Sequence, residues 1–198
     1  MTLDDRRLKI LLAVALALVG FGIWAFVLRG ADGPADPSLG DTVDSSGAPD
    51  TTALPGNPDR VLLQGFDEVA VTVDPGDGSL LAWCLLAALN AQQRSRGLME
   101  VTDLQGYSGM AFVYEEDSQN SYHTRNTPMP LSIAWIAADG TVVTITDMEP
   151  CEDREDCPRY APTGPYRYAI EVPQGDLATL GITEGSKVTI GGSCAPTT

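Results

Sequence analysis

The chain has 198 residues, enough for one domain of ordinary size plus accessory segments, and its formal net charge is −15 at pH 7. From residue 30 onward, 8 Arg and Lys residues stand against 25 Asp and Glu residues, which gives this part a net charge of −17. A surface of this charge repels phosphate backbones and anionic lipid headgroups, which argues against nucleic acid as a partner and against electrostatic adhesion to membranes.

An apolar segment near the N-terminus predicts a membrane anchor. Residues 10–28 are apolar or small and uncharged, and as a helix they would span roughly 28 Å, close to the hydrocarbon thickness of about 30 Å. Basic residues cluster in the tail before it, over 1–9, which predicts a cytoplasmic N-terminus and a domain outside the cell membrane. A cleaved signal peptide, giving a secreted form, is the alternative, but its apolar region is usually only about 7–15 residues long.

The next segment predicts a disordered acidic linker. Residues 29–57 consist mainly of Gly, Pro, Asp, Ser, Thr and Ala. Such a composition buries too little apolar surface to offset the chain entropy lost on folding. We therefore expect the folded, extracytoplasmic domain to occupy residues 58–198.

Within this domain, short apolar segments predict strands. The expected strands cover residues 60–63, 68–73, 80–89, 110–114, 131–136, 142–147, 166–172 and 187–190.

Polar residues and glycines mark the connections between these strands. Asn90 predicts the N-cap of a short helix over 91–96, which Gly97 would end. Asp139-Gly140 is a strong hairpin signal, and residues 175–180 predict one more helical turn. The pattern indicates an α+β domain, mainly antiparallel, that curls toward a barrel and carries one or two short helices.

Four cysteines remain outside the membrane segment, and their even number predicts two disulfides. Three connectivities are open. We favour Cys151–Cys157, which closes a short loop, and Cys84–Cys194, which ties the start of the domain to its end. Zinc binding would need tight Cys-x-x-Cys or Cys/His spacing, which the chain lacks. The carboxylates between Glu149 and Asp156 could hold calcium, but we favour a solvated acidic loop and expect no metal and no other cofactor.

Several sequence blocks resemble one family. They are Arg94-Ser95-Arg96-Gly97-Leu98-Met99, Gly109 to Tyr114, Tyr122 to Ile136, Asp139-Gly140, Tyr166 to Gly175 and Gly181 to Gly185. In this order and spacing they resemble the family called domain of unknown function 192, over residues 80–192. The resemblance implies an extracytoplasmic, compact and mainly β domain. A link to carbohydrate metabolism is suggested for the family, but the resemblance implies no specific activity.

The sequence departs from the family pattern at two places. The family usually carries an aromatic residue and then Trp-Met-Lys-Asn-Thr where this chain has Tyr122-His123-Thr124-Arg125-Asn126-Thr127. It commonly has Pro-Leu-Asp where Pro130-Leu131-Ser132 stands here. A catalytic role of that Asp throughout the family is therefore in doubt.

The best candidates for a ligand site are Arg125, Asn126 and Thr127, which stand just before a Pro-x-Pro segment and an apolar strand. A guanidinium offers a planar fork to carboxylates, phosphates or sugar hydroxyls, and an amide both donates and accepts. The alternative is that Asn126 and Thr127 bond only the local backbone. Arg96 is a further candidate, although a cation at a helix C-terminus is also explained by the helix dipole.

These observations favour a membrane-tethered binding or accessory module for a small polar or carbohydrate-type ligand of the cell envelope. A protein–protein interaction domain that uses an exposed strand edge is the first alternative. A glycan hydrolase, with Asp147, Glu149 or Glu171 as acid and base, is the second. The only histidine, His123, stands where the family has Trp, so we expect it to have a packing role and favour a function without catalysis.

Overall fold

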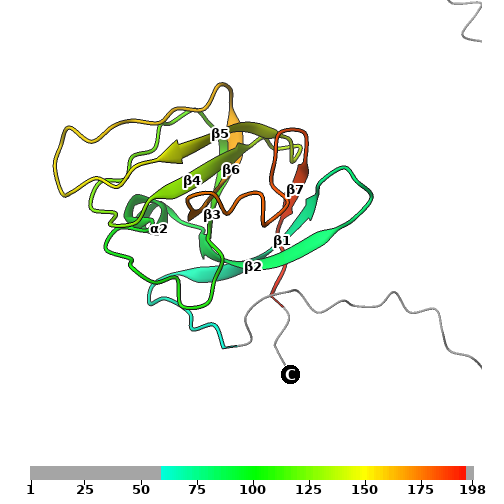
Figure 1. Cartoon of the computed structure of the whole chain (residues 1–198), viewed down its shortest axis with the longest axis horizontal. Helices are drawn as coiled ribbons and strands as arrows, with labels where there is room; N and C mark the ends of the chain where they lie inside the picture. Colours follow the sequence, from blue (N-terminus) through cyan, green and yellow to red (C-terminus); the bar gives the residue numbers. More distant parts are fainter. Residues whose placement is uncertain (1–58, 195–198) are drawn as a thin grey trace, which may run out of the picture. The chain divides into compact units, whose positions relative to one another are not determined.

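The computed structural model describes residues 59–194, which form a seven-stranded sheet with one short helix (Figure 1). In chain order the elements are β1 (Asp67–Asp74), β2 (Leu81–Ala88), α2 (Ala91–Arg96), β3 (Met110–Ser118), β4 (Leu131–Ile136), β5 (Val142–Met148), β6 (Tyr166–Pro173) and β7 (Lys187–Ile190). The predicted basic tail, signal anchor and linker lie outside the described residues. Within 59–194, no helix is long and apolar enough to cross a membrane.

The strand order in the sheet is β5-β4-β6-β3-β2-β1-β7. Only β2 and β3 pair in parallel, and every other neighbouring pair is antiparallel. A parallel pair needs a crossover connection, which α2 and the residues after it provide. The predicted α+β, mainly antiparallel fold is therefore confirmed.

The sheet curls, but it does not close into a barrel, and this part of the prediction is wrong. Closure requires a continuous ladder between the first and last strands. Here the two edge strands approach each other at one corner only, through an isolated bridge between Thr141 and Lys187. Beside this bridge the Val188 amide donates to the Gly140 carbonyl at 2.9 Å.

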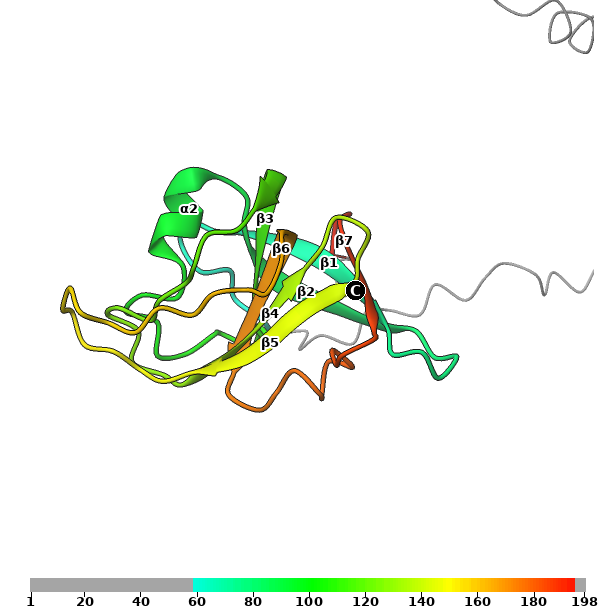
Figure 2. The same ribbon diagram turned by 90° about the horizontal axis from the view of Figure 1, so that it is seen from above.

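Each face of the sheet carries its own apolar core. The helix-side core is covered by α2 and residues 97–107, and includes Met110, Phe112 and Trp135. The turn-side core is covered by residues 174–186, which contribute Leu177, Leu180 and Ile182. Figure 2 shows α2 and the segment after β6 on opposite sides of the sheet. Every residue of β4 is buried, which explains why this strand is almost continuously apolar.

The predicted helix is confirmed, and a capping box holds its start. The Asn90 side chain accepts from the Gln93 amide, and the Gln93 side chain accepts from the Asn90 amide. The Gln93 side chain is buried and also donates to Asp67 at 2.7 Å. The helix is therefore fixed to the start of β1.

One local prediction is wrong. Residues 60–63 form no strand, because their backbone joins no ladder; the Val61 amide instead donates to the Gln105 carbonyl at 2.9 Å. Residues 175–180 form the single helical turn that was predicted, as successive turns in which the Leu180 amide donates to the Asp176 carbonyl at 3.3 Å. This turn is too short to continue as a regular helix.

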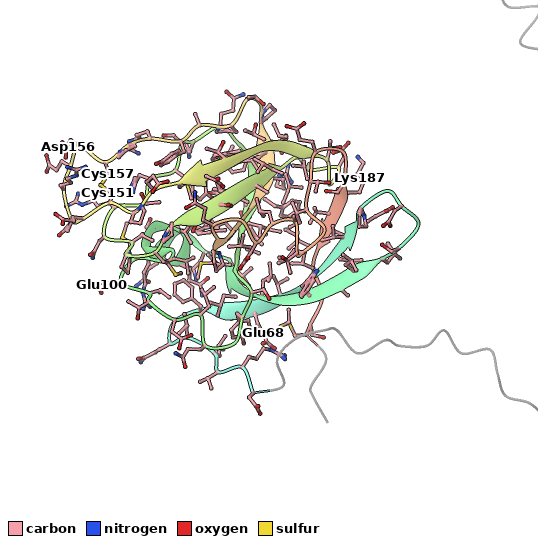
Figure 3. The ribbon with its side chains drawn as sticks, in the orientation of Figure 1. Glu68, Glu100, Cys151, Asp156, Cys157 and Lys187 are labelled. Atoms are coloured by element: carbon pink, nitrogen blue, oxygen red, sulfur yellow. A yellow bond between two sulfur atoms is a disulfide. The ribbon has the colours of Figure 1, made fainter. Side chains whose placement is uncertain are left out.

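Both predicted disulfides are confirmed. Cys84–Cys194 joins β2 to the chain after β7, and Cys151–Cys157 closes the loop that follows β5. Figure 3 shows that the Cys151–Cys157 loop and Lys187 lie on opposite sides of the folded domain.

The close approach of Gly140 to Val188 leads to a first prediction. Gly140 has φ of +85°, and a Cβ atom there would lie 2.5 Å from the Val188 carbonyl oxygen. Gly78 has φ of +90° but no heavy atom within 4 Å of the same position. Gly78→Ala should cost only the backbone strain of about 1–2 kcal/mol. Gly140→Ala should cost about 1–3 kcal/mol more, because it also overpacks the corner where the two edges meet. Urea unfolding of both variants measures the difference, and equal losses would show that this corner is not tightly packed.

The disulfides make a second prediction. Cys84 and Cys194 are 110 residues apart in sequence, and Cys151 and Cys157 are 6 apart. By loop-closure entropy the long link should stabilise by about 4.8 kcal/mol and the short link by about 2.4 kcal/mol. We expect Cys84→Ala/Cys194→Ala to lower the free energy of unfolding more than Cys151→Ala/Cys157→Ala does. The reverse order in urea unfolding would contradict this account.

Candidate functional site

A cavity of about 150 Å³ opens on the helix-side face of the sheet. Its wall is formed by the end of α2 and the residues just after it, two aromatic side chains of β3, the segment before β4, and the first residue of β4. One side chain of the loop between β5 and β6 and one side chain of β6 complete it. The lining residues are Arg94, Ser95, Arg96, Gly97, Leu98, Met99, Phe112, Tyr114, Asn120, Ser121, Tyr122, His123, Thr127, Leu131, Arg159 and Glu171. We call it the Glu171 cavity.

Glu171 is the only acidic residue among these side chains. In the sheet it pairs with Met110 of β3 and Ile133 of β4, which both belong to the helix-side core. Since paired residues point to the same face, the sheet directs the Glu171 side chain into this core. The residue is 5% exposed. Among residues 59–194 we find no hydrogen bond or ion pair to its carboxyl group.

Burial raises the pKa of Glu171 from its ordinary value of 4.5 to about 8. At pH 7 the carboxyl group is therefore mostly protonated, so it can both donate and accept a hydrogen bond. A buried polar group without a partner costs free energy, and a ligand that supplies the missing hydrogen bonds recovers part of that cost.

Three aromatic rings form a rigid wall beside Glu171. The Tyr122 ring meets the Phe112 ring edge to face, with centroids 5.3 Å apart. The hydroxyl groups of Tyr114 and Tyr122 are 2.8 Å apart and share a hydrogen bond. Burial raises the pKa of Tyr122 well above its ordinary value, so this ring stays neutral. The wall is thus preformed and offers apolar ring surfaces with polar tips, two of the rings being set edge to face.

Three guanidinium groups stand around the cavity. Arg94 lies 4.7 Å over the Tyr114 ring and donates through Nη1 to the Val113 carbonyl at 2.8 Å. Arg96 lies 4.9 Å over the Phe66 ring and donates to the Gln64 carbonyl. Arg159 is exposed. Stacking on aromatic rings fixes the orientation of the first two groups.

His123 also lines the cavity. Burial lowers the pKa of its imidazole, and the nearby charges of Arg159 and Arg125 lower it further. The ring is therefore neutral at pH 7, and its Nδ1 accepts from the Arg125 amide at 3.3 Å. This contact is compatible with the packing role expected for His123. The position of His123 beside the cavity was not predicted.

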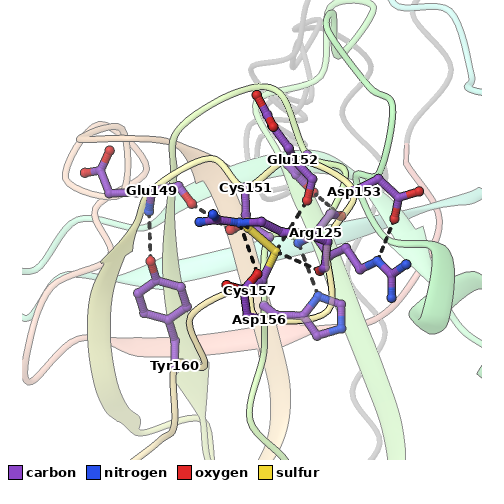
Figure 4. The surroundings of a disulfide bond; sticks show 12 residues. Arg125, Glu149, Cys151, Glu152, Asp153, Asp156, Cys157 and Tyr160 are labelled. Atoms are coloured by element: carbon purple, nitrogen blue, oxygen red, sulfur yellow. Dashed lines mark hydrogen bonds and ion pairs between the residues drawn. A yellow bond between two sulfur atoms is a disulfide. The ribbon is translucent and has the colours of Figure 1, made fainter.

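Two of the four predicted ligand residues line the Glu171 cavity, and the other two do not. Arg96 and Thr127 line the Glu171 cavity. Arg125 does not line it and forms an exposed ion pair with Asp153 at 2.6 Å (Figure 4). Asn126 also lies outside it and donates to the Glu100 side chain at 3.2 Å.

The alternative that Asn126 and Thr127 bond only the local backbone agrees with the contact of the Thr127 side chain, but not with that of the Asn126 side chain, which bonds Glu100. Asn126 has φ of 55°, in the left-handed region that Asn tolerates better than most residues. Its carbonyl accepts from the amide of Glu100, which has φ of 62°. The buried Thr127 hydroxyl donates to the Arg125 carbonyl at 3.4 Å.

Two of the three carboxylates proposed for a hydrolase, Asp147 and Glu171, lie on opposite faces of the sheet. Asp147 pairs with Ser132, accepts from its hydroxyl, and lies on the face opposite to Glu171, because Ser132 pairs with Val172 of the turn-side core. Glu149 is exposed, and its backbone amide donates to the Tyr160 hydroxyl, as Figure 4 shows. The acid and the base of a glycosidase must flank the same glycosidic bond. Asp147 and Glu171 cannot do so, because the sheet lies between them.

Sequence reasoning did not identify the aromatic wall, Arg94 or Arg159 as parts of a site. One signal was present. Glu171 stands in the segment Ala169-Ile170-Glu171-Val172, where a lone carboxylate interrupts buried apolar residues. A charged residue at such a position is either paired or functional.

Comparison with known proteins agrees with this fold. The model of the DUF192 family, described as "Uncharacterized ACR", matches residues 73–190. A crystal structure of a protein of unknown function from Novosphingobium aromaticivorans is similar, with 28% identity and a TM-score of 0.59; the match covers 72% of this chain and 99% of that one. A protein from Sinorhizobium meliloti, described as a candidate transcription regulator, has 25% identity and a TM-score of 0.54, over 63% of this chain and 95% of that one. No curated protein matches the chain.

The raised pKa of Glu171 makes a third prediction. Between the ordinary value of 4.5 and the folded value of about 8, the folded state holds a proton that the unfolded state has lost. The contribution of Glu171 to stability is therefore complete below pH 4.5 and is lost as pH rises toward 8. Glu171→Gln cannot ionise, so its free energy of unfolding should exceed that of the natural chain by a growing amount, on the order of a few kcal/mol, as pH rises from 5 to 8.

Urea unfolding at several pH values measures this gap. Exposed Glu184 gives the matched control, since Glu184→Gln removes the same charge from the surface. A gap between Glu171→Gln and the natural chain that stays constant from pH 5 to 8 would contradict the assignment.

Proposed function

The chain belongs to the DUF192 family, and we propose that its domain binds a small polar ligand of carbohydrate type in the Glu171 cavity. The observation that carries the proposal is the buried Glu171 carboxyl group, which has no hydrogen-bonding partner among residues 59–194 and lines an open cavity. Binding sites typically combine apolar and aromatic walls with a few polar groups that fix the orientation of the ligand.

The size of the cavity supports a ligand of about one ring. An apolar cavity of about 150 Å³ accommodates benzene, and the Glu171 cavity has the same volume. Its mixed lining suits a ring with one apolar face and several hydroxyl groups. The rings of Phe112, Tyr114 and Tyr122 would contact that face, and Glu171 and Thr127 would bond hydroxyl groups.

We place this function outside the cytoplasm, on a domain tethered to the cell membrane by residues 10–28. Two disulfides support this location, since such bonds persist in oxidising compartments and are rare in the cytosol. The uncharged apolar run preceded by basic residues supports the anchor and its orientation. A cleaved and secreted form is the alternative.

Two other roles have weaker support. The outer edge of β5 pairs with no other strand of the described residues, and an envelope protein could add a strand there. We do not extend the description of the Sinorhizobium meliloti protein to DNA binding by this chain, because a net charge of −17 from residue 30 onward repels the phosphate backbone.

A steric test of the cavity makes the fourth prediction. Ser95 is exposed on α2 and lines the cavity, whereas Gln92 is exposed on the same helix and does not. Ser95→Trp should block ligand entry, and Gln92→Trp should introduce the same side chain without blocking it. The measurement is a thermal-shift screen of the oxidised full-length protein against monosaccharides, sugar acids and sugar phosphates.

A ligand at about 100 times its dissociation constant stabilises by roughly 2.7 kcal/mol, which raises Tm by several degrees. We expect at least one such ligand for the natural chain and for Gln92→Trp, and none for Ser95→Trp. A ligand that stabilises all three proteins equally would place binding elsewhere. Silence across the screen would favour the protein-interaction role.

A further inference from the structure

We propose that the ligand of the Glu171 cavity carries an anionic group, a carboxylate or a phosphate, on its single polar ring, and that Arg94, Arg96 and Arg159 bind this group. The inference rests on the proposed function and specifies the charge of the ligand. It comes from the way that basic side chains are distributed over the described residues.

Eight basic residues follow residue 30, and all of them lie within the described part of the chain. Five of them form ion pairs with carboxylates: Arg60 with Glu68, Arg125 with Asp153, Arg154 with Asp156, Arg167 with Asp117, and Lys187 with Asp139. The other three have no ion pair within residues 59–194, and all three line the Glu171 cavity.

This distribution is unexpected in a domain with a large excess of carboxylates. A guanidinium on such a surface easily finds an acidic neighbour, as the five paired cations show. The three arginines without an ion pair instead surround one concave site. Their positive electrostatic potentials add there, so an anion is attracted to this site although the surface around it is acidic.

The guanidinium groups retain donors for a ligand. Arg94 uses only Nη1 for its bonds to the carbonyls of Leu89 and Val113, and Arg96 uses only Nη1 for its bond to Gln64. A guanidinium has five N–H donors in a planar fork, which suits the two oxygens of a carboxylate or phosphate. Arg159 makes no hydrogen bond to any side chain or backbone group in 59–194, so all its donors are available.

The remaining titratable groups in the cavity do not cancel this positive charge at pH 7. Burial raises the pKa of Glu171 to about 8, so it is mostly neutral. His123 is neutral because its pKa is lowered, and Tyr122 is neutral because its pKa is raised. An anion therefore meets three positive groups at the rim and an uncharged hydrogen-bonding carboxyl group below them.

The test compares neutral sugars with their anionic counterparts on the oxidised full-length protein. The probes are glucose and galactose, glucuronate and galacturonate, and the two 6-phosphates, measured by titration calorimetry at pH 7 and low salt. Arg159→Gln removes one rim charge. Arg154→Gln is the matched control, because Arg154 is exposed, lies outside the cavity and pairs with Asp156.

We expect at least one anionic probe to bind about tenfold or more tightly than the neutral sugar of the same configuration, as charged hydrogen bonds would give. Arg159→Gln should lose about tenfold in affinity for that probe, and Arg154→Gln should lose none. Binding of the uronates alone would identify a sugar acid, and binding of the phosphates alone a sugar phosphate; each supports the inference.

Neutral sugars that bind as tightly as the anions, with no effect of Arg159→Gln, would overturn the anionic inference and leave the proposed function standing. No binding of any probe by the natural chain would overturn both.

Discussion

The pairing of β6 with β3 and β4 is the interaction on which the rest of the domain depends. It places β6 inside the sheet, between β4 and β3, with an apolar core on each face. Ile170 and Val172 must then face one core, while Ala169 and Glu171 face the other. The register that buries the apolar residues of β6 is therefore the same register that buries a carboxyl group. The stability of the two cores holds Glu171 in the cavity in spite of the cost of burying it.

The parts of the fold that depend on local sequence could be predicted. The strand at Leu131–Ile136 is continuously apolar apart from Ser132 and has its predicted bounds, as has the helix after Asn90. The favoured disulfide pairs are also confirmed: the sequence left three connectivities open, and the one with a short loop and an end-to-end link is the one observed. In each case the determining residues are close in sequence or few in number.

The candidate site could be predicted only in part, because sheet order assembles it. Arg96 and Thr127 were candidates from their local context. Arg159 could not be one, since nothing near it in the sequence shows that its loop returns to the end of α2. The same holds for the segment 60–63, whose apolar residues read as a strand although no strand pairs with them. Both outcomes depend on contacts between residues that are distant in sequence, and a single sequence does not reveal such contacts.

The two disulfides also determine what happens to the domain after its backbone is cut. Residues 152–156, of which four are acidic, form an exposed loop, a kind of segment that proteases reach easily. A cut there leaves both new ends joined through Cys151–Cys157. A cut in any other loop between Cys84 and Cys194 leaves the two fragments joined through the long link. A nicked molecule therefore stays covalently whole and keeps its paired strands together, which would protect the domain from proteases at the extracytoplasmic location proposed above.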